Sequence, residues 1–201
     1  QTRGLPISYI MSVGNQASLG FSEIGMYLLS DPRVTALGLH IEGIGNLRAF
    51  EELATKARKL GKPIVALKVG KSVEARKATQ SHTASLAGNA QSAKSLFKRL
   101  GIAEVDRLEV LIDTLKIFHS YGPLSSKNVR SLSCSGGEAS LVSDLALEYG
   151  VQFPKLEKEN IFELRSVLGE MVALSNPLDY HTYIWGDIDA MASTFIAMMR
   201  Q

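Results

Sequence analysis

The feature that most constrains the fold of this chain is a regular alternation of short apolar runs with longer amphipathic segments. Apolar runs typical of strands are predicted at residues 7–14, 34–43, 62–70 and 102–106. Segments with apolar residues at helical spacing follow them, at residues 21–31, 46–61, 85–101 and 107–122. Because such runs suit parallel strands covered on both faces, this order predicts an α/β fold with an open parallel sheet of the flavodoxin or Rossmann sort.

A second unit is predicted after residues 123–128, where Pro, Ser and Asn concentrate as in a linker. Its pattern gives a strand, two helices and a loop, at residues 129–135, 136–150, 157–169 and 175–187. We therefore expect two domains, residues 1–124 and residues 125–201. Both are expected to be truncated, because the chain lacks an initial methionine and stops inside an amphipathic helix without a terminating glycine.

The composition narrows the classes of function. A hydrophobic fraction of 45% suffices for globular cores, and the 22 basic and 20 acidic side chains are interspersed, which argues against nucleic-acid and membrane surfaces. Neither residues 43–48 nor residues 70–72 complete a dinucleotide-binding fingerprint or a P-loop, and both are interpreted as tight turns. The single cysteine, Cys134, excludes an internal disulfide and fits a cytoplasmic location.

The diglycine turn at residues 135–138, Ser-Gly-Gly-Glu, is a candidate phosphate-binding site. A strand is predicted to end there and a helix to begin, so free N–H groups and the positive end of the helix dipole converge on one point. The alternative is a capping box, in which Ser135 and Glu138 only satisfy the amides of their own helix.

His82 is the candidate catalytic residue. It stands in Ser-His-Thr-Ala-Ser-Leu-Ala-Gly, residues 81–88, where hydroxyl and small side chains leave room for a bulky charged adduct on the imidazole. A surface or helix-capping histidine is the alternative that the pattern alone leaves open. The four histidines, at positions 40, 82, 119 and 181, show no paired spacing for a metal, so no metal site is predicted.

Six motifs follow one another over nearly the whole chain: SVGN at 12–15, HIEG at 40–43, KPIVALKVGKS at 62–72, SHTASLAG at 81–88, SGGEAS at 135–140 and NPLD at 176–179. Together they resemble the nucleoside-diphosphate-forming acyl-CoA synthetases, a superfamily that includes ADP-forming acetate–CoA ligase and succinyl-CoA synthetase. Ala84 departs from the glycine usual in that family. The resemblance implies the central segment of an acid–CoA ligase, with a histidine-bearing flavodoxin-like domain followed by the first half of a second one.

The resemblance also implies a phosphohistidine mechanism. The acid is activated as an acyl phosphate, CoA displaces the phosphate, and the phosphoryl group passes through a histidine to or from a nucleoside diphosphate. His82 matches that histidine, and Glu42 matches the carboxylate that orients it. Their chemistry fits, because a neutral imidazole is nucleophilic near pH 7 and a carboxylate bonded to the opposite ring N–H fixes its tautomer.

Further site residues are implied by the same resemblance. In the family, two helix N-termini from neighbouring domains flank the phosphohistidine, and one of them matches the diglycine turn. The predicted phosphate-binding residues are Ser135, Gly136, Gly137, Glu138 and Asn15.

The loop at residues 175–187 is expected to border the histidine site. Asp179, Tyr180 and Trp185 are predicted to line a substrate pocket, where aromatic rings wall an acyl group or grip a cationic head. A packed loop cluster is the equally open alternative.

The expected substrates and partners lie mostly outside this chain. They are a carboxylic acid or acyl phosphate, CoA, and ATP or ADP with Mg²⁺, with nothing but phosphate bound by the fragment itself. A CoA-binding domain and an ATP-grasp domain are expected in the same chain or in a partner subunit, within a homo-oligomer. Two alternatives stay open: a non-catalytic regulatory module, for example fused to an acetyltransferase, and a flavodoxin-like nucleotide or FMN binder.

Overall fold

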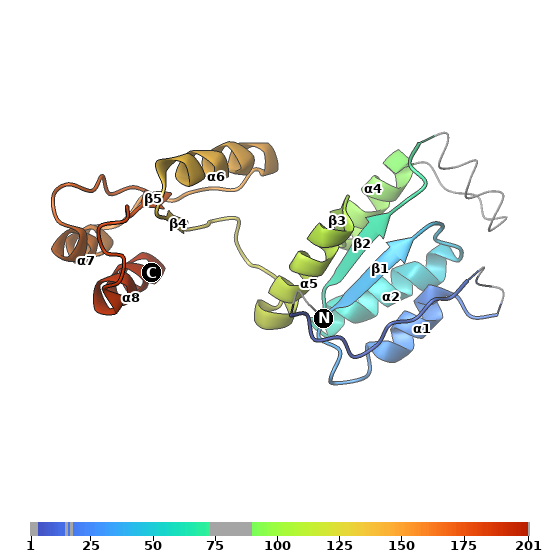
Figure 1. Cartoon of the computed structure of the whole chain (residues 1–201). Coiled ribbons are helices and arrows are strands. Elements are labelled where there is room, and N and C mark those ends of the chain that lie inside the picture. The colour runs from blue at the N-terminus through green and yellow to red at the C-terminus, as the bar shows by residue number, and fades with distance from the viewer. Residues whose placement is uncertain (1–3, 15, 17, 73–89, 201) are drawn as a thin grey trace. The chain divides into compact units, whose positions relative to one another are not determined.

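The computed structural model describes residues 4–14, 16, 18–72 and 90–200 of the chain. It divides into two compact units, Gln1–Leu124 and Ser125–Gln201, shown in Figure 1. The division falls within the stretch that the sequence marks as a linker. Within the described ranges, no helix is both long enough and apolar enough to cross a bilayer.

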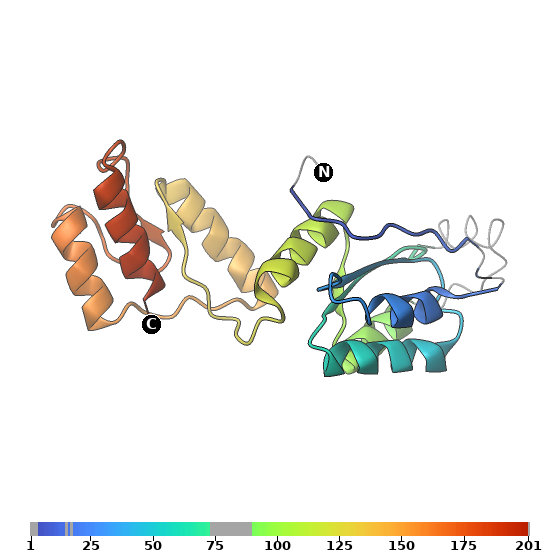
Figure 2. The ribbon, with the colours of Figure 1, turned by 90° about the horizontal axis from the view of Figure 1, so that it is seen from below.

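Unit 1 is built on a parallel sheet of strand order β1-β2-β3, with helices on both faces (Figures 1 and 2). The strands are β1 (Leu37–Ile41), β2 (Ile64–Lys68) and β3 (Ala103–Val105). The helices are α1 (Phe21–Leu28), α2 (Leu47–Lys59), α4 (Ala90–Leu100) and α5 (Leu108–Tyr121). The predicted α/β fold with a parallel sheet is confirmed.

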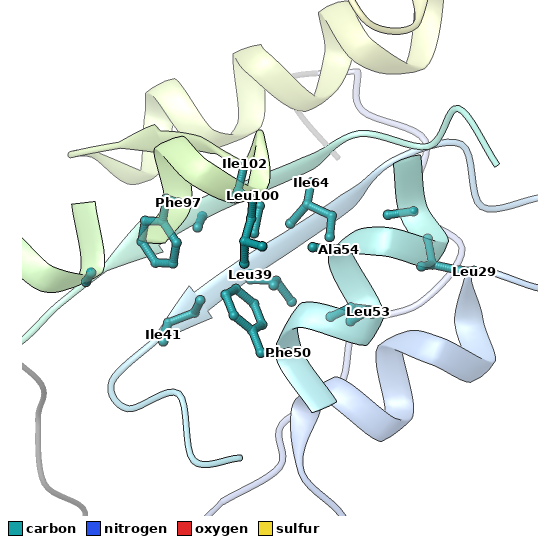
Figure 3. Packing of buried hydrophobic residues seen from close by; sticks show 13 residues of the cluster. Leu29, Leu39, Ile41, Phe50, Leu53, Ala54, Ile64, Phe97, Leu100 and Ile102 are labelled. Carbon is teal, nitrogen blue, oxygen red and sulfur yellow. The ribbon is translucent and has the colours of Figure 1, made fainter. Parts of the chain in front are cut away.

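Two apolar clusters hold the layers of unit 1 together. The larger lies between the sheet and helices α1, α2 and α4, with Phe50 fully buried near its centre (Figure 3). The Phe50 ring makes edge-to-face contacts with Phe21 at 5.6 Å and with Phe97 at 6.1 Å between centroids. On the other face of the sheet, Val65 of β2 packs with Leu111 of α5. Burial on both faces explains why β2 is apolar almost throughout.

The predicted strand at residues 7–14 is wrong, because this run forms no strand in the structure. Its apolar side chains face solvent, with Ile10 85% exposed and Met11 58% exposed. Side chains hold the run in place: the Tyr9 hydroxyl donates to the Asp31 carboxylate at 2.6 Å. A β-strand forms only where a neighbouring strand pairs with its backbone N–H and C=O groups. An apolar composition does not reveal whether such a neighbouring strand is present.

Helix ends in unit 1 follow their local signals. Asn46 caps α2 by accepting a hydrogen bond from the Ala49 N–H at 3.1 Å. Gly61 has a φ of +64°, and the N–H of the next residue, Lys62, returns to the Ala57 carbonyl at 2.9 Å. This left-handed turn ends α2 where the sequence predicts it.

Over its described residues, 125–200, unit 2 contains two very short parallel strands and three helices. The strands are β4 (Leu132–Ser133) and β5 (Leu178–Asp179), which pair with each other. The helices are α6 (Gly136–Tyr149), α7 (Lys158–Leu168) and α8 (Ile188–Met199). The strand predicted at 129–135 is thus shortened to two residues, and the segment predicted as a loop at 175–187 contains β5.

Candidate functional site

The carboxyl ends of β1, β2 and β3 meet at one edge of the unit 1 sheet, where open α/β sheets bind their ligands. Glu42 follows β1 directly and is exposed. Lys68 is the last residue of β2. Beside them, the Lys71 ammonium forms an ion pair with the Glu104 carboxylate of β3, Nζ to Oε1 2.8 Å. We call Glu42, Lys68, Lys71 and Glu104 the carboxyl-edge cluster.

Lys68 is the most buried member of this cluster, with 4% of its surface exposed. Its ammonium donates to the Glu42 carbonyl at 2.8 Å and to the Val69 carbonyl. Burial lowers the pKa of Lys68 below its usual value, and the neighbouring Lys71 lowers it further, while Glu42 and Glu104 oppose both effects. The charge of Glu42 thus favours the protonated form of Lys68.

Lys68 also borders a pocket of about 640 Å³. The described residues of its wall come from the turn after β1, the start of α2, the end of β2 and helix α4; they are Ile44, Gly45, Leu47, Lys68, Gln91, Ser92, Ala93, Ser95, Leu96 and Arg99. The volume is that of a small-molecule site, and the wall combines two cationic side chains with hydroxyl groups. The Arg99 guanidinium is already paired with the Glu51 carboxylate, which reduces the attraction of this wall for an anion.

Two predicted site residues, His82 and Asn15, lie outside the described residues. Of the proposed histidine–carboxylate pair, the structure therefore describes Glu42 alone. The chain beyond Ser72, which leads toward His82, starts from the same carboxyl edge.

The diglycine turn forms the start of α6, and all four of its residues are exposed. Ser135 is the N-cap residue, but its side chain makes no capping hydrogen bond, so the capping-box alternative is wrong. At such an exposed helix start, water can satisfy the backbone N–H groups in place of the Ser135 side chain. The first intrahelical bond runs from the Ala139 N–H to the Ser135 carbonyl at 3.1 Å. The earlier N–H groups, of residues 136–138, are open to a ligand.

Asp179 lies beside this helix start. A Cβ atom placed on Gly136 would be 3.4 Å from the Asp179 carboxylate. The same carboxylate accepts a hydrogen bond from the His181 N–H at 2.9 Å, and the His181 ring lies 3.9 Å from it. Of the predicted loop residues, Asp179 is thus the one brought next to the diglycine turn.

The aromatic side chains of the loop at residues 175–187 divide into two groups. Tyr180 is 9% exposed and packs edge-to-face on Phe195 in the core of unit 2, at 5.7 Å between centroids. Trp185 and Tyr183 are exposed, at 59% and 71%, and Tyr183 stacks on the His181 ring at 5.3 Å. The packed-cluster interpretation fits Tyr180, whereas the Trp185 and Tyr183 rings are accessible to a ligand.

Lys68 is not among the site residues that the sequence motifs predict. A usable signal was present, because a lysine closes an otherwise apolar five-residue strand, and charged residues are almost never fully buried unless paired. Among the described residues, no three His, Cys, Asp or Glu side chains gather as a possible metal site.

The chain is similar to a known domain family and to characterised ligases. Residues 1–118 match the family described as the succinyl-CoA ligase like flavodoxin domain. Over 172 residues the chain is 36% identical to the alpha subunit of an ADP-forming acetate–CoA ligase II from Pyrococcus furiosus, covering 86% of this chain and 37% of that protein. It is 34% identical, also over 172 residues, to an ADP-forming acetate–CoA ligase from Methanocaldococcus jannaschii, covering 86% of this chain and 24% of that protein.

A solved structure is similar as well. It is a dinucleotide-forming acetyl-coenzyme A synthetase 1 from Candidatus Korarchaeum cryptofilum, in complex with phosphate and ADP, with a TM-score of 0.80 and 26% sequence identity. The match covers 94% of this chain and 40% of that one. The chain therefore spans between 24% and 40% of the length of these three proteins.

Proposed function

This chain belongs to the succinyl-CoA ligase like flavodoxin domain family, and we propose that it is the central segment of an ADP-forming acid–CoA ligase. The observation that carries the proposal is the 36% identity to the alpha subunit of an ADP-forming acetate–CoA ligase over 172 residues. Residues 1–124 are proposed as the histidine-bearing domain, and residues 125–201 as the first half of a second flavodoxin-like domain. The proposed substrate class is a carboxylic acid.

The proposed reaction makes acyl-CoA in three transfers. A ring nitrogen of His82 forms a bond to the terminal phosphorus of ATP as the bond to ADP breaks. The carboxylate oxygen of the acid then takes the phosphoryl group from His82, which gives acyl phosphate and the free imidazole. Last, the CoA sulfur attacks the acyl carbon, phosphate leaves, and the thiol proton passes to the surroundings. Glu42 holds the His82 ring and stabilises its positive charge while phosphorus is transferred.

Phosphate recognition is assigned to Ser135, Gly136, Gly137 and Glu138, with Asn15 as a further ligand. The exposed first turn of α6 supports this, because its N–H groups carry no side-chain cap. Trp185 and Asp179 are proposed to border the acid, while the Tyr180 ring serves the core. Mg²⁺ would neutralise phosphate charge on the bound nucleotide; the described residues offer no cluster that fits it, and it is assigned to the ATP-grasp domain.

The partners follow from the same proposal. A CoA-binding domain and an ATP-grasp domain, on this polypeptide or on a partner subunit, complete the ligase. We propose a cytoplasmic homo-oligomer, a location supported by the single cysteine, Cys134.

The test uses the whole ligase and ATP labelled in its terminal phosphate. The wild type should acquire an acid-labile protein label, and His82→Asn should abolish it; a label retained by His82→Asn removes this residue from the mechanism. Glu42→Gln should slow labelling by about 10²- to 10⁴-fold, because the ring loses its orienting partner. Glu52→Gln, an exposed carboxylate on α2, is the control and should label like the wild type.

A further inference from the structure

Lys68 keeps a charge where an apolar residue would pack more easily. Along β2, Ile64 and Ala66 lie in the larger core, and Lys68 continues the same side of the strand at its carboxyl end. Removing an ammonium from water is costly unless anions or carbonyl oxygens replace the water. A neutral side chain could donate to the same carbonyl groups without the cost of removing a charge from water. The charge of Lys68 therefore needs a functional explanation.

The ammonium joins two loops. Lys68 is the register partner of Ile41, the last residue of β1. Its two described acceptors are the carbonyls of Glu42 and Val69, the residues at which the chain leaves β1 and β2. One loop therefore starts at the proposed orienting carboxylate, and the other leads toward His82. Both starting points are fixed to a single buried nitrogen.

Lys62 also donates from its ammonium to two backbone carbonyls, but it is less buried than Lys68 and lies away from the candidate site. Its ammonium donates to the carbonyls of Leu29 and Asp31, both at 2.7 Å, at the amino end of β2. Lys62 is only half-buried, and it is absent from the described wall of the pocket that Lys68 borders. The two lysines thus make the same kind of contact near opposite ends of β2, and only Lys68 adjoins the candidate site.

On the basis of the proposed function, we infer that Lys68 is a positioning residue for phosphoryl transfer. Its ammonium fixes the loop that carries Glu42 relative to the loop that leads to His82, and it supplies a positive charge at the carboxyl edge. Fixed charges and fixed loop ends favour transfer because no reorganisation is needed when the phosphoryl group arrives.

The experiment compares Lys68→Met with Lys62→Met in the whole ligase. Each variant removes one ammonium with two carbonyl acceptors, and the melting temperature of each is measured so that rates are compared where both proteins are folded. Lys68→Met should slow phosphoenzyme formation by about 10²-fold and lower kcat, with the KM for the acid unchanged. Lys62→Met should stay within about twofold of the wild type at temperatures where it is folded. Lys68→Arg, which keeps the charge, should recover most of the rate.

Two further outcomes separate the inference from its premise. Equal rates for Lys68→Met and Lys62→Met, with a labelled wild type, would overturn the role of Lys68 and leave the proposed function intact. A wild type that takes no label would overturn both. If Lys68→Met does not fold, Lys68→Gln takes its place, since its amide keeps N–H donors for the two carbonyls and carries no charge; a wild-type rate in that variant would equally refute the inference.

Discussion

Gly137→Ala should make the chain more stable and at the same time weaken its interaction with phosphate. Gly137 is the second residue of α6, and a Cβ built on it meets only the Ser135 hydroxyl, at 3.5 Å. The added methyl group is therefore sterically accepted. Alanine in place of glycine in a helix gains at most about 0.5–1 kcal/mol. For a unit of this size, 0.5 kcal/mol corresponds to a rise in melting temperature of about 2–4 °C.

The methyl group would occupy the open space beside the Ser135 hydroxyl, where we propose that phosphate approaches the first-turn amides. A ligand that binds only the folded state stabilises it by an amount that grows with the logarithm of its concentration relative to its Kd. Phosphate should therefore raise the urea midpoint of the wild type more than that of Gly137→Ala, although the variant starts from the higher value. Chloride at equal ionic strength is the control for general salt effects.

Trp185 allows the assay to report on unit 2 alone, because it is the single tryptophan of the chain. Its fluorescence would be followed through a urea titration. Gly25→Ala is the control, and it should lower the stability of unit 1, because a Cβ there would lie 2.9 Å from a Leu53 methyl group. This loss of stability is measured by circular dichroism. An unchanged phosphate effect in Gly137→Ala would refute the phosphate role of the diglycine turn, and a lower midpoint would refute the helix argument.

Two further predictions concern unit 1. Phe50→Ala should lower its free energy of unfolding by about 3–5 kcal/mol, measured by circular dichroism in urea, because the ring is fully buried between two others; a loss below about 1 kcal/mol would contradict that packing. Hydrogen bonds from Arg33 and Tyr9 hold the pKa of Asp31 well below its usual value. Asp31 therefore stabilises the fold above its unfolded pKa of about 3.9 and loses this effect only as the pH falls through the lower folded value. Asp31→Asn should therefore reduce the loss of stability at acidic pH, measured as the free energy of unfolding against pH. An unchanged pH dependence would count against the hydrogen bonds of Asp31 with Arg33 and Tyr9.

The helices were the most predictable part of this fold, because their signals are local. The apolar spacing of α2, the Asn46 cap and the glycine turn at Gly61 all lie within one short segment. Strands were predicted less well, since pairing is decided by residues far away in sequence. Residues 7–14 are apolar but unpaired in the structure, whereas residues 178–179 form β5 inside a segment that reads as a loop.

The candidate site shows the same division. The position of Glu42 at the end of a strand follows from the sequence pattern, because the carboxyl ends of parallel strands meet at one edge. The burial of Lys68 and the packing of Tyr180 do not follow from it. Both depend on which neighbours enclose a side chain, and the same residue types are common on protein surfaces.

Asp179 gives the start of α6 a neighbour of negative sign. An anion that reaches this helix is attracted by the amides and repelled by the carboxylate, so it binds less tightly than the amides alone would allow. In the ligase that we propose, released phosphate would leave this helix end more readily than it would leave one without a neighbouring carboxylate.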